Sequence, residues 1–174
     1  MLLDLLKAWR GHHDICVDLG AGTGVLGAYA SFHGICERVV LVDVNPLALE
    51  NARANVIANK LEQRALVMGS SEFLRDEIAD AVVANPPYLP GIPKDAYEEA
   101  LLGGPEGWET VLYFVDEGRR LLKCGGTLYL VFSSLSRPWR VWERLREGFE
   151  LVAERTKRYF YEELYGVIAK KICR

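Results

Sequence analysis

Short runs of apolar residues alternate along the chain with segments of helical periodicity. Strands are predicted at 15–18, 39–43, 65–68, 80–84, 127–132, 150–156 and 164–171. Helices are predicted at 25–33, 46–59, 108–122 and 138–146. Apolar runs without polar alternation are typical of strands covered on both faces. The pattern therefore predicts an α/β fold, an open doubly wound, mostly parallel sheet of about seven strands with helices on both faces.

Turn-forming residues define the boundaries of these elements. Asn45 and Pro46 suit the cap and first position of the second helix, and Gly125-Gly126 is predicted to end the third. Between Pro86 and Gly107 the composition shifts to Pro, Gly, Tyr and acidic residues, which predicts one long loop. The apolar start is interrupted by Asp4, unlike a secretory leader.

Composition narrows the class of protein. The 174 residues carry a net charge of −3, half of them are hydrophobic, and the pI is near 5.7. Such a chain forms one domain with a sizeable core and does not hold nucleic acid by overall charge alone. The four cysteines are scattered singly, so they are expected to be reduced and mostly buried in a cytoplasmic protein, with a Cys16–Cys173 disulfide as the alternative.

A glycine-rich turn follows the first predicted strand, with the sequence Asp18-Leu-Gly-Ala-Gly-Thr-Gly24. Glycines at this position let the backbone turn tightly and approach a nucleotide closely. Asp43 ends the second strand, where a carboxylate can accept hydrogen bonds from ribose hydroxyls. Gly22, Gly24 and Gly27 also satisfy the dinucleotide pattern, so a nicotinamide enzyme stays open. An acid before the glycines favours a cationic ligand such as S-adenosylmethionine over a pyrophosphate.

The tetrapeptide Asn85-Pro-Pro-Tyr88 ends the fourth strand and is the most informative segment. Two prolines hold Asn85 and its neighbours in extended geometry before a ligand arrives. The Asn85 side-chain oxygen and the Pro86 carbonyl can accept both hydrogens of a planar NH₂ group, while Tyr88 offers a ring face. Such a clamp aims the nitrogen lone pair at a methyl group and needs no metal. His12, His13 and His33 likewise lack spaced partners for a metal site or a triad.

These motifs together resemble a class I S-adenosylmethionine-dependent methyltransferase with a Rossmann-like fold. Leu102-Gly-Gly-Pro-Glu-Gly107 and Phe160-Tyr-Glu-Glu-Leu164 resemble segments of the HemK-type protein-glutamine methyltransferases. The resemblance covers essentially the whole chain and is strongest to the short archaeal and eukaryotic enzymes. It implies one domain over 1–174, with a cofactor half at about 1–84, a substrate clamp and loop at 85–108, and a C-terminal half at 109–174.

The resemblance also assigns roles to individual residues. Those implied to bind the cofactor are Asp18, Gly20, Ala21, Gly22, Thr23, Asp43, Ser71, Glu72 and Asn85. Asn85, Pro86 and Tyr88 are the implied catalytic residues, and Pro87 completes the substrate clamp. The implied substrate is the glutamine of the Gly-Gly-Gln loop of a class I translation release factor, with a small zinc-binding activator subunit as a further partner.

The sequence departs from this family at two points. An aspartate that usually contacts the adenine amine is replaced by Gly69-Ser-Ser-Glu72, so Ser71 or Glu72 is expected to serve. The chain also begins at Met1-Leu-Leu, without the Pro-containing, acidic-hydroxyl segment that the short enzymes carry there.

Three other functions stay open from the sequence. One is a nicotinamide enzyme, and another is a cofactor-binding subunit that activates a partner. The third is an adenine N6 methyltransferase acting on RNA or DNA. A possible basic edge supports it, formed by Arg137, Arg140, Arg144, Arg146, Arg155, Lys157 and Arg158 with Trp139, Trp142 and Tyr159 nearby. Interleaved glutamates favour a solvated helix face with core aromatics instead.

Overall fold

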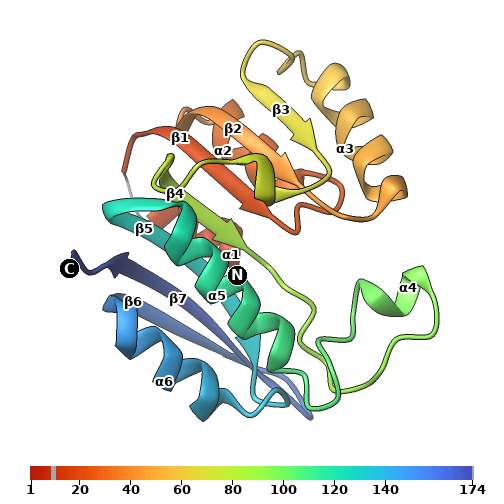
Figure 1. Cartoon of the computed structure of the whole chain (residues 1–174), viewed down its shortest axis with the longest axis vertical. Coiled ribbons are helices and arrows are strands. Elements are labelled where there is room, and N and C mark those ends of the chain that lie inside the picture. Colours follow the sequence, from red (N-terminus) through yellow and green to blue (C-terminus); the bar gives the residue numbers. More distant parts are fainter. Residues whose placement is uncertain (9–10, 174) are drawn as a thin grey trace.

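A computed structural model describes residues 1–8 and 11–173 and contains one seven-stranded sheet (Figure 1). The strand order is β3-β2-β1-β4-β5-β7-β6. The strands are β1 (His13–Leu19), β2 (Cys36–Val42), β3 (Ala65–Met68), β4 (Ala79–Ala84), β5 (Leu122–Ser133), β6 (Phe149–Arg158) and β7 (Glu163–Lys171). The first five are parallel, whereas β7 runs antiparallel between β5 and β6.

Helices cover both faces of the sheet, as predicted. They are α1 (Leu2–Ala8), α2 (Val25–Phe32), α3 (Pro46–Ala58), α4 (Ala96–Glu99), α5 (Glu109–Leu121) and α6 (Pro138–Gly148), with a 3₁₀ turn η1 (Ser71–Phe73). On one face α1, α2 and α3 pack together, and on the other α5 packs on β4 and β5 and contacts α6 (Figure 1). Each face buries its own apolar cluster. The sheet, packed on both faces, therefore holds the loops at its ends in place, and these loops are available to form a site.

Local sequence signals account for most element boundaries. Asn45 caps α3 because its side-chain oxygen accepts a hydrogen bond from the Leu47 N–H at 2.9 Å, and Pro46 occupies the first turn. The continuous apolar runs form the buried central strands. Two helices were not predicted: α1, and the four-residue α4 inside the long loop.

The prediction that Gly125-Gly126 ends the helix before them is wrong. Helix α5 ends at Leu121, and the two glycines lie inside β5. There β5 bulges away from β4, since Leu122 pairs with Ala79 whereas Thr127 pairs with Ala81. Gly125 has a φ of 72°. The glycines therefore permit a bulge rather than a helix end.

The cysteines form two disulfides, which corrects the expectation of free thiols. Cys16 on β1 is bonded to Cys36 on β2, with Cα atoms 5.9 Å apart, and Cys124 is bonded to Cys173 across 5.1 Å. Both separations suit a disulfide. The alternative Cys16–Cys173 pairing is excluded because each of these cysteines has another partner. A cytoplasmic location stays a prediction, since disulfides also occur inside thermophile cells.

Among the described residues, no helix combines the length and the apolar character needed to cross a bilayer.

Candidate active site

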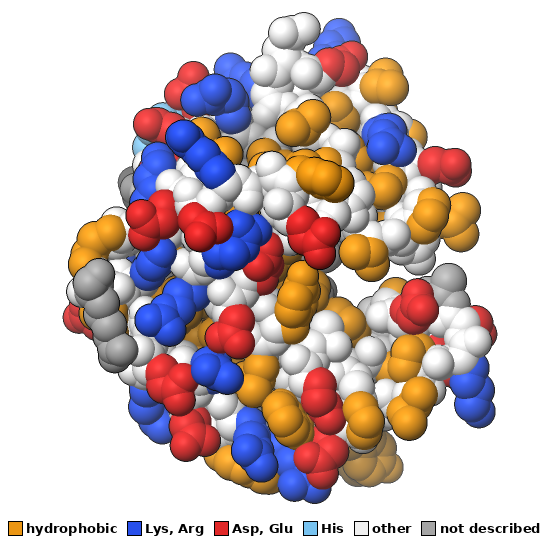
Figure 2. Space-filling view, in the orientation of Figure 1, with side chains coloured by type: hydrophobic (Ala, Val, Ile, Leu, Met, Phe, Trp, Pro, Cys, Tyr) orange, Lys and Arg blue, Asp and Glu red, His pale blue; other side chains and the backbone are white. Residues whose placement is uncertain are grey.

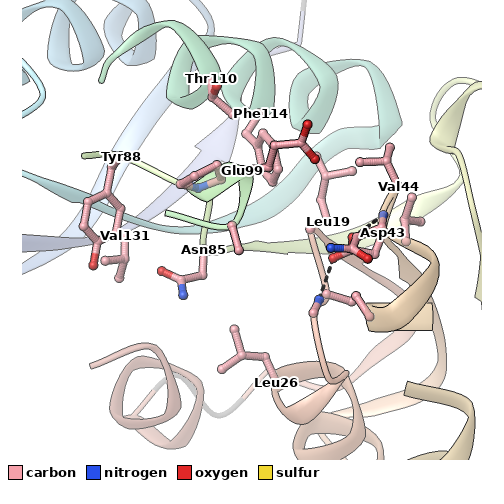
Figure 3. A pocket seen from close by; sticks show the side chains of 18 of the residues that line it. Leu19, Leu26, Asp43, Val44, Asn85, Tyr88, Glu99, Thr110, Phe114 and Val131 are labelled. Atoms are coloured by element: carbon pink, nitrogen blue, oxygen red, sulfur yellow. Dashed lines mark hydrogen bonds between the residues drawn. The ribbon is translucent and has the colours of Figure 1, made fainter. Parts of the chain in front are cut away.

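A cavity of about 950 Å³ lies at the carboxyl ends of the central strands. Strand order reverses between β1 and β4, which is where open α/β sheets bind ligands. The surface is hollowed between the body of the molecule and the segment that carries α4 (Figure 2). The residues that line the cavity come from the glycine turn, the end of β2, the segment after β3, the Asn-Pro-Pro-Tyr segment and α5 (Figure 3). The predicted cofactor and acceptor segments therefore share one cavity.

The glycines in and after this turn have two different roles. Gly20 and Gly22 line the cavity in left-handed conformations, with φ of 69° and 56°. A Cβ added at Gly22 would meet no atom within 4 Å, so the open space there belongs to the cavity. At Gly27 a Cβ would lie 2.4 Å from the Leu41 side chain. Gly27 therefore packs α2 closely onto the sheet and does not line the cavity.

Asp43 lies at the cavity wall with its carboxylate held in place. One oxygen accepts a hydrogen bond from the Gly22 N–H at 2.7 Å, and the other accepts one from the Asn45 N–H at 2.9 Å (Figure 3). A carboxylate oxygen has a second lone pair. The side chain therefore keeps acceptor capacity for vicinal hydroxyl groups while its orientation is fixed.

Asp18 is placed differently from the prediction of direct cofactor contact. It is buried, it does not line the cavity, and one of its oxygens accepts a hydrogen bond from the Gly27 N–H at 2.7 Å. The other oxygen is buried without a partner. Burial, with a smaller contribution from the negative charge of Asp43, raises the pKa of Asp18 to about 7. Asp18 thus supports the turn from beneath because its side chain points to the α2 face of the sheet.

Two serines follow β3, and the hydroxyl of the second, Ser71, hydrogen-bonds to the Glu117 carboxylate. Ser70 and Ser71 line the cavity, and Ser70 caps η1 by accepting the Glu72 N–H. Glu72 is exposed and is not a lining residue. Of the two residues expected to replace the usual aspartate, the structure therefore brings only Ser71 to the cavity, and it adds Ser70.

The Asn-Pro-Pro-Tyr segment forms the opposite wall of the cavity. Asn85, Pro87 and Tyr88 line it, whereas the Pro86 ring is buried. Figure 3 shows the Asn85 amide projecting into the open space, and no described residue hydrogen-bonds to it. Burial raises the pKa of Tyr88, and the nearby charge of Glu162 adds to this rise. Tyr88 therefore stays a neutral phenol.

The glycine loop at 103–107 packs directly on the backbone of this segment. The Leu89 carbonyl accepts the Gly103 N–H at 2.8 Å, and the Gly104 carbonyl accepts the Gly91 N–H at 2.8 Å. A Cβ on Gly103 would lie 2.4 Å from the Pro87 carbonyl oxygen, and one on Gly107 would lie 2.5 Å from the Tyr88 backbone carbonyl oxygen. The GG-x-x-G motif thus holds the clamp in position because only glycine permits this approach.

An ion pair ties the same loop to α6. The Glu106 carboxylate bonds to the Arg137 guanidinium and accepts the Trp108 indole N–H at 2.9 Å. The Arg140 guanidinium lies over the Trp108 ring at 5.1 Å from its centroid. Several cations of the possible basic edge are therefore engaged within the protein.

The other residues of that edge agree only in part with the expectation of a solvated helix face with core aromatics. Arg144 pairs with Asp116 and Glu147, and Arg158 pairs with Glu163. Trp142 packs against Phe132 and Tyr165 and is a core aromatic, as expected. The same expectation is wrong for Trp139 and Tyr159, which are about half exposed.

Several residues that line the cavity were not predicted from the sequence. Val44 and Phe114 flank the cavity beside Asp43, and Glu99 enters it from α4. Met1, Leu2 and Leu3 of the unpredicted N-terminal segment line another wall. Only Val44, next to Asp43 in the sequence, carried a local signal.

Three exposed side chains that the histidine spacing did not group lie together elsewhere. His12, Asp14 and Glu37 place ligand atoms within 4.8 Å of one another, outside the cavity lining. His12 also contacts the Gly34 carbonyl at 3.2 Å.

Comparison with known proteins identifies the class to which this fold and cavity belong. The model of the family described as "Methyltransferase small domain" matches residues 1–162. Mouse "Methyltransferase HEMK2" is 32% identical over 158 residues, covering 84% of this chain and 73% of HEMK2. The chain therefore belongs to the methyltransferase small domain family, with the HemK-type enzymes.

Two further relatives carry names that bear on function. The "Release factor glutamine methyltransferase" of Mycolicibacterium smegmatis is 36% identical over 121 residues, covering 64% of this chain and 43% of the relative. The chain thus spans less than half of that protein. A structure of the E. cuniculi Mtq2–Trm112 complex, described as methylating the translation termination factor eRF1, aligns with a TM-score of 0.73 at 28% identity, covering 98% of this chain and 92% of that one.

Proposed function

We propose that the chain transfers a methyl group from S-adenosylmethionine to the side-chain amide of the glutamine in the Gly-Gly-Gln motif of a class I translation release factor. The observation that carries this proposal is a single cavity with a held carboxylate, Asp43, at one wall and a preorganised amide, Asn85, at another. The relative named as a release factor glutamine methyltransferase and the Mtq2–Trm112 structure support the choice of acceptor.

The lining residues fit this cofactor. The Asp43 carboxylate would accept the ribose hydroxyls, and the space at Gly22, where a Cβ would meet no atom, leaves room for the ligand next to the backbone. Val44 and Phe114 offer apolar surface for the base. When bound, S-adenosylmethionine supplies a methyl group on an electrophilic sulfonium.

The clamp residues would prepare the acceptor nitrogen. An amide nitrogen is a poor nucleophile because its lone pair is delocalised. Asn85 Oδ1 and the Pro86 carbonyl would accept hydrogen bonds from its two N–H groups, which returns electron density to nitrogen and fixes the direction of its lone pair. Tyr88 would pack against the amide plane. As the N–C bond forms and the C–S bond breaks, the C–S electron pair would stay on sulfur as a neutral thioether, and the nitrogen would release one proton to water. Placement of this kind contributes roughly 7–11 kcal/mol to lowering a barrier.

The test is transfer of a methyl group to a purified release factor. Mass spectrometry of the Gly-Gly-Gln peptide should show one added methyl group with the wild-type protein. Asn85→Ala should lower the rate by about 100-fold or more because the acceptor is no longer aligned. Asn51→Ala, on the exposed surface of α3, is the matched control and should keep full activity.

The same assay distinguishes the other methyl acceptor. RNA and DNA carrying unmethylated adenine are incubated in parallel, with a purified partner subunit present in every reaction. Methylation of adenine N6 with an unmodified release factor would replace the glutamine assignment with the adenine one.

We further propose that a small partner subunit binds beside edge strand β3. The support is a group of exposed apolar side chains on neighbouring elements, which are Leu47, Ile57, Leu66 and Phe73. An open edge strand with apolar flanks invites pairing with another chain. The Mtq2–Trm112 structure supports a partner of this kind, and the zinc-binding character of the subunit rests on the family resemblance.

A further inference from the structure

Glu99 is an acidic residue in the cavity that the mechanism above does not use. It ends α4 and lines the cavity together with residues of the glycine turn and α5. In Figure 3 the Glu99 side chain lies next to Phe114, with its carboxylate on the side that faces Val44. No hydrogen bond or ion pair from a described residue reaches that carboxylate. A carboxylate that faces a ligand cavity without a protein partner is available to a ligand.

Contacts on both sides of Glu99 fix its position. Asp95 caps the short helix by accepting the Tyr97 and Glu98 N–H groups at 2.9 and 2.8 Å. The Glu98 carbonyl accepts the Leu102 N–H at 2.8 Å, and Leu102 bridges to Leu89. The Glu98 carboxylate accepts the Lys94 N–H at 2.8 Å, so that acid serves the loop itself. These hydrogen bonds hold in place the segment from which Glu99 reaches the cavity.

The place of Glu99 relative to Asp43 indicates which part of the cofactor it meets. A ribose held on Asp43 directs its base toward the adjacent wall, where Val44 follows Asp43 in the chain. The Phe114 ring lies over Gly20, since a Cβ there would be 2.7 Å from a ring carbon. A flat base fits between an aliphatic and an aromatic side chain. The edge of that base would then face the Glu99 carboxylate.

The chemistry of the two groups matches. The adenine edge carries an exocyclic amine that donates hydrogen bonds, and an ionised carboxylate only accepts them. We propose that Glu99 accepts a hydrogen bond from this amine and makes the site specific for adenine over purines that lack the amine. The inference rests on the proposed use of S-adenosylmethionine. The long loop would then supply a carboxylate contact to the adenine amine, whereas the segment after β3 places only Ser70 and Ser71 at the cavity.

The test compares two ligands by isothermal titration calorimetry. One is S-adenosylhomocysteine, which carries no sulfonium charge, and the other is its purine analogue without the amine. Wild-type protein should bind the adenine ligand about tenfold more tightly or better, as expected for a hydrogen bond to a charged group. In Glu99→Ala this preference should fall to a few-fold, and Glu99→Gln, which keeps an uncharged acceptor, should be intermediate. Glu62→Ala, an exposed acid outside the cavity, is the matched control and should keep the wild-type ratio.

The outcomes separate this inference from the proposed function. An unchanged ratio in Glu99→Ala, or an equal loss of affinity for both ligands, overturns the assignment to the adenine amine. A wild-type protein that binds neither ligand overturns the use of this cofactor and the inference with it. A thermal melt of each variant shows whether the variant is folded.

Discussion

Asp18 and Asp43 show how two carboxylates near one glycine turn acquire different tasks. Asp43 accepts two backbone N–H groups and faces the cavity, whereas Asp18 lies beneath the turn with one oxygen unpartnered. The difference follows from the strands. Side chains alternate between faces along β1, so Asp18 points toward α2, and Asp43 follows the end of β2. Sequence position alone made both appear to be ligand-binding residues.

The buried state of Asp18 predicts a pH dependence of stability. Its pKa is raised to about 7 in the folded protein, against an ordinary value of 3.8. The folded state therefore binds the proton more tightly, and this contribution to stability is complete below about pH 4 and is lost as the pH rises through about 7. Asp18→Asn should remove a decline on the order of 2–4 kcal/mol in the free energy of unfolding between pH 4 and pH 8.

Urea denaturation at a series of pH values measures this effect. Asn keeps an oxygen for the Gly27 N–H, so the variant should fold, and Asp14→Asn on the exposed surface is the control. Identical pH slopes for wild type and Asp18→Asn would show that Asp18 is ionised in the folded protein without cost.

At the scale of elements, the glycine loop is a support for the clamp. Gly103→Ala places a Cβ against the Pro87 carbonyl oxygen and should displace Asn85 and Tyr88. We expect kcat/KM to fall by about 10-fold or more, since misplacement of this size weakens alignment of the acceptor. The affinity for S-adenosylhomocysteine, measured by calorimetry, should stay within about twofold if the cofactor wall is undisturbed.

Gly69→Ala is the comparison variant for this prediction. A Cβ at Gly69 meets only the Leu49 side chain, at 3.7 Å, which is an ordinary contact. Equal kinetic losses in both variants would mean that glycine replacement weakens the fold in general and that Gly103 has no particular link to the clamp.

The disulfide between Cys124 and Cys173 should contribute to stability. It closes a sequence separation of 49 residues and fastens the end of the chain to β5. The double variant Cys124→Ser, Cys173→Ser should lose about 2–4 kcal/mol of unfolding free energy. Titration of unreduced, unfolded wild-type protein with a thiol reagent should find no free thiols, and four free thiols would contradict both pairings.

The sequence predicted the strands and helices better than it predicted the contacts between them. Continuous apolar runs and the Asn45-Pro46 cap predict strands and helices directly, because these signals are local. The cysteine pairs depend on register. Thr127 lies opposite Lys170 in the antiparallel pair, and only by continuing this register does Cys124 come opposite Cys173. The cysteines lie singly along the sequence, and their positions there gave no indication of this pairing.

The site was predictable to the extent that its motifs are contiguous. The glycine turn, Asp43 and Asn85 to Tyr88 each follow a strand, and parallel strands bring their carboxyl ends together. Glu99 could not be predicted, since an acid in a polar loop resembles any solvated residue. Its role depends on a four-residue helix that no periodicity reveals.

At the scale of the whole molecule, the proposed partner surface can be tested through the exposed side chain of Phe73. It is 83% exposed next to edge strand β3, and Phe160 on the β6–β7 turn is 90% exposed far from that edge in the strand order. Phe73→Asp should abolish co-purification with a small partner subunit expressed together with the chain, because a charge would be buried on binding. Phe160→Asp is the control and should leave co-purification intact. Loss of binding in both, or in neither, would contradict the β3 location.

Met1, Leu2 and Leu3 are part of the cavity wall, which gives the first residues of the chain a practical importance. Anything joined ahead of Met1, a natural extension or a purification tag, emerges beside the space where ligands are expected. A tag at that end can therefore compete with a ligand or cover the entrance. Binding and activity are best measured on protein tagged at the other end, and a difference between the two tagged forms would itself report how closely the first residues follow the bound ligand.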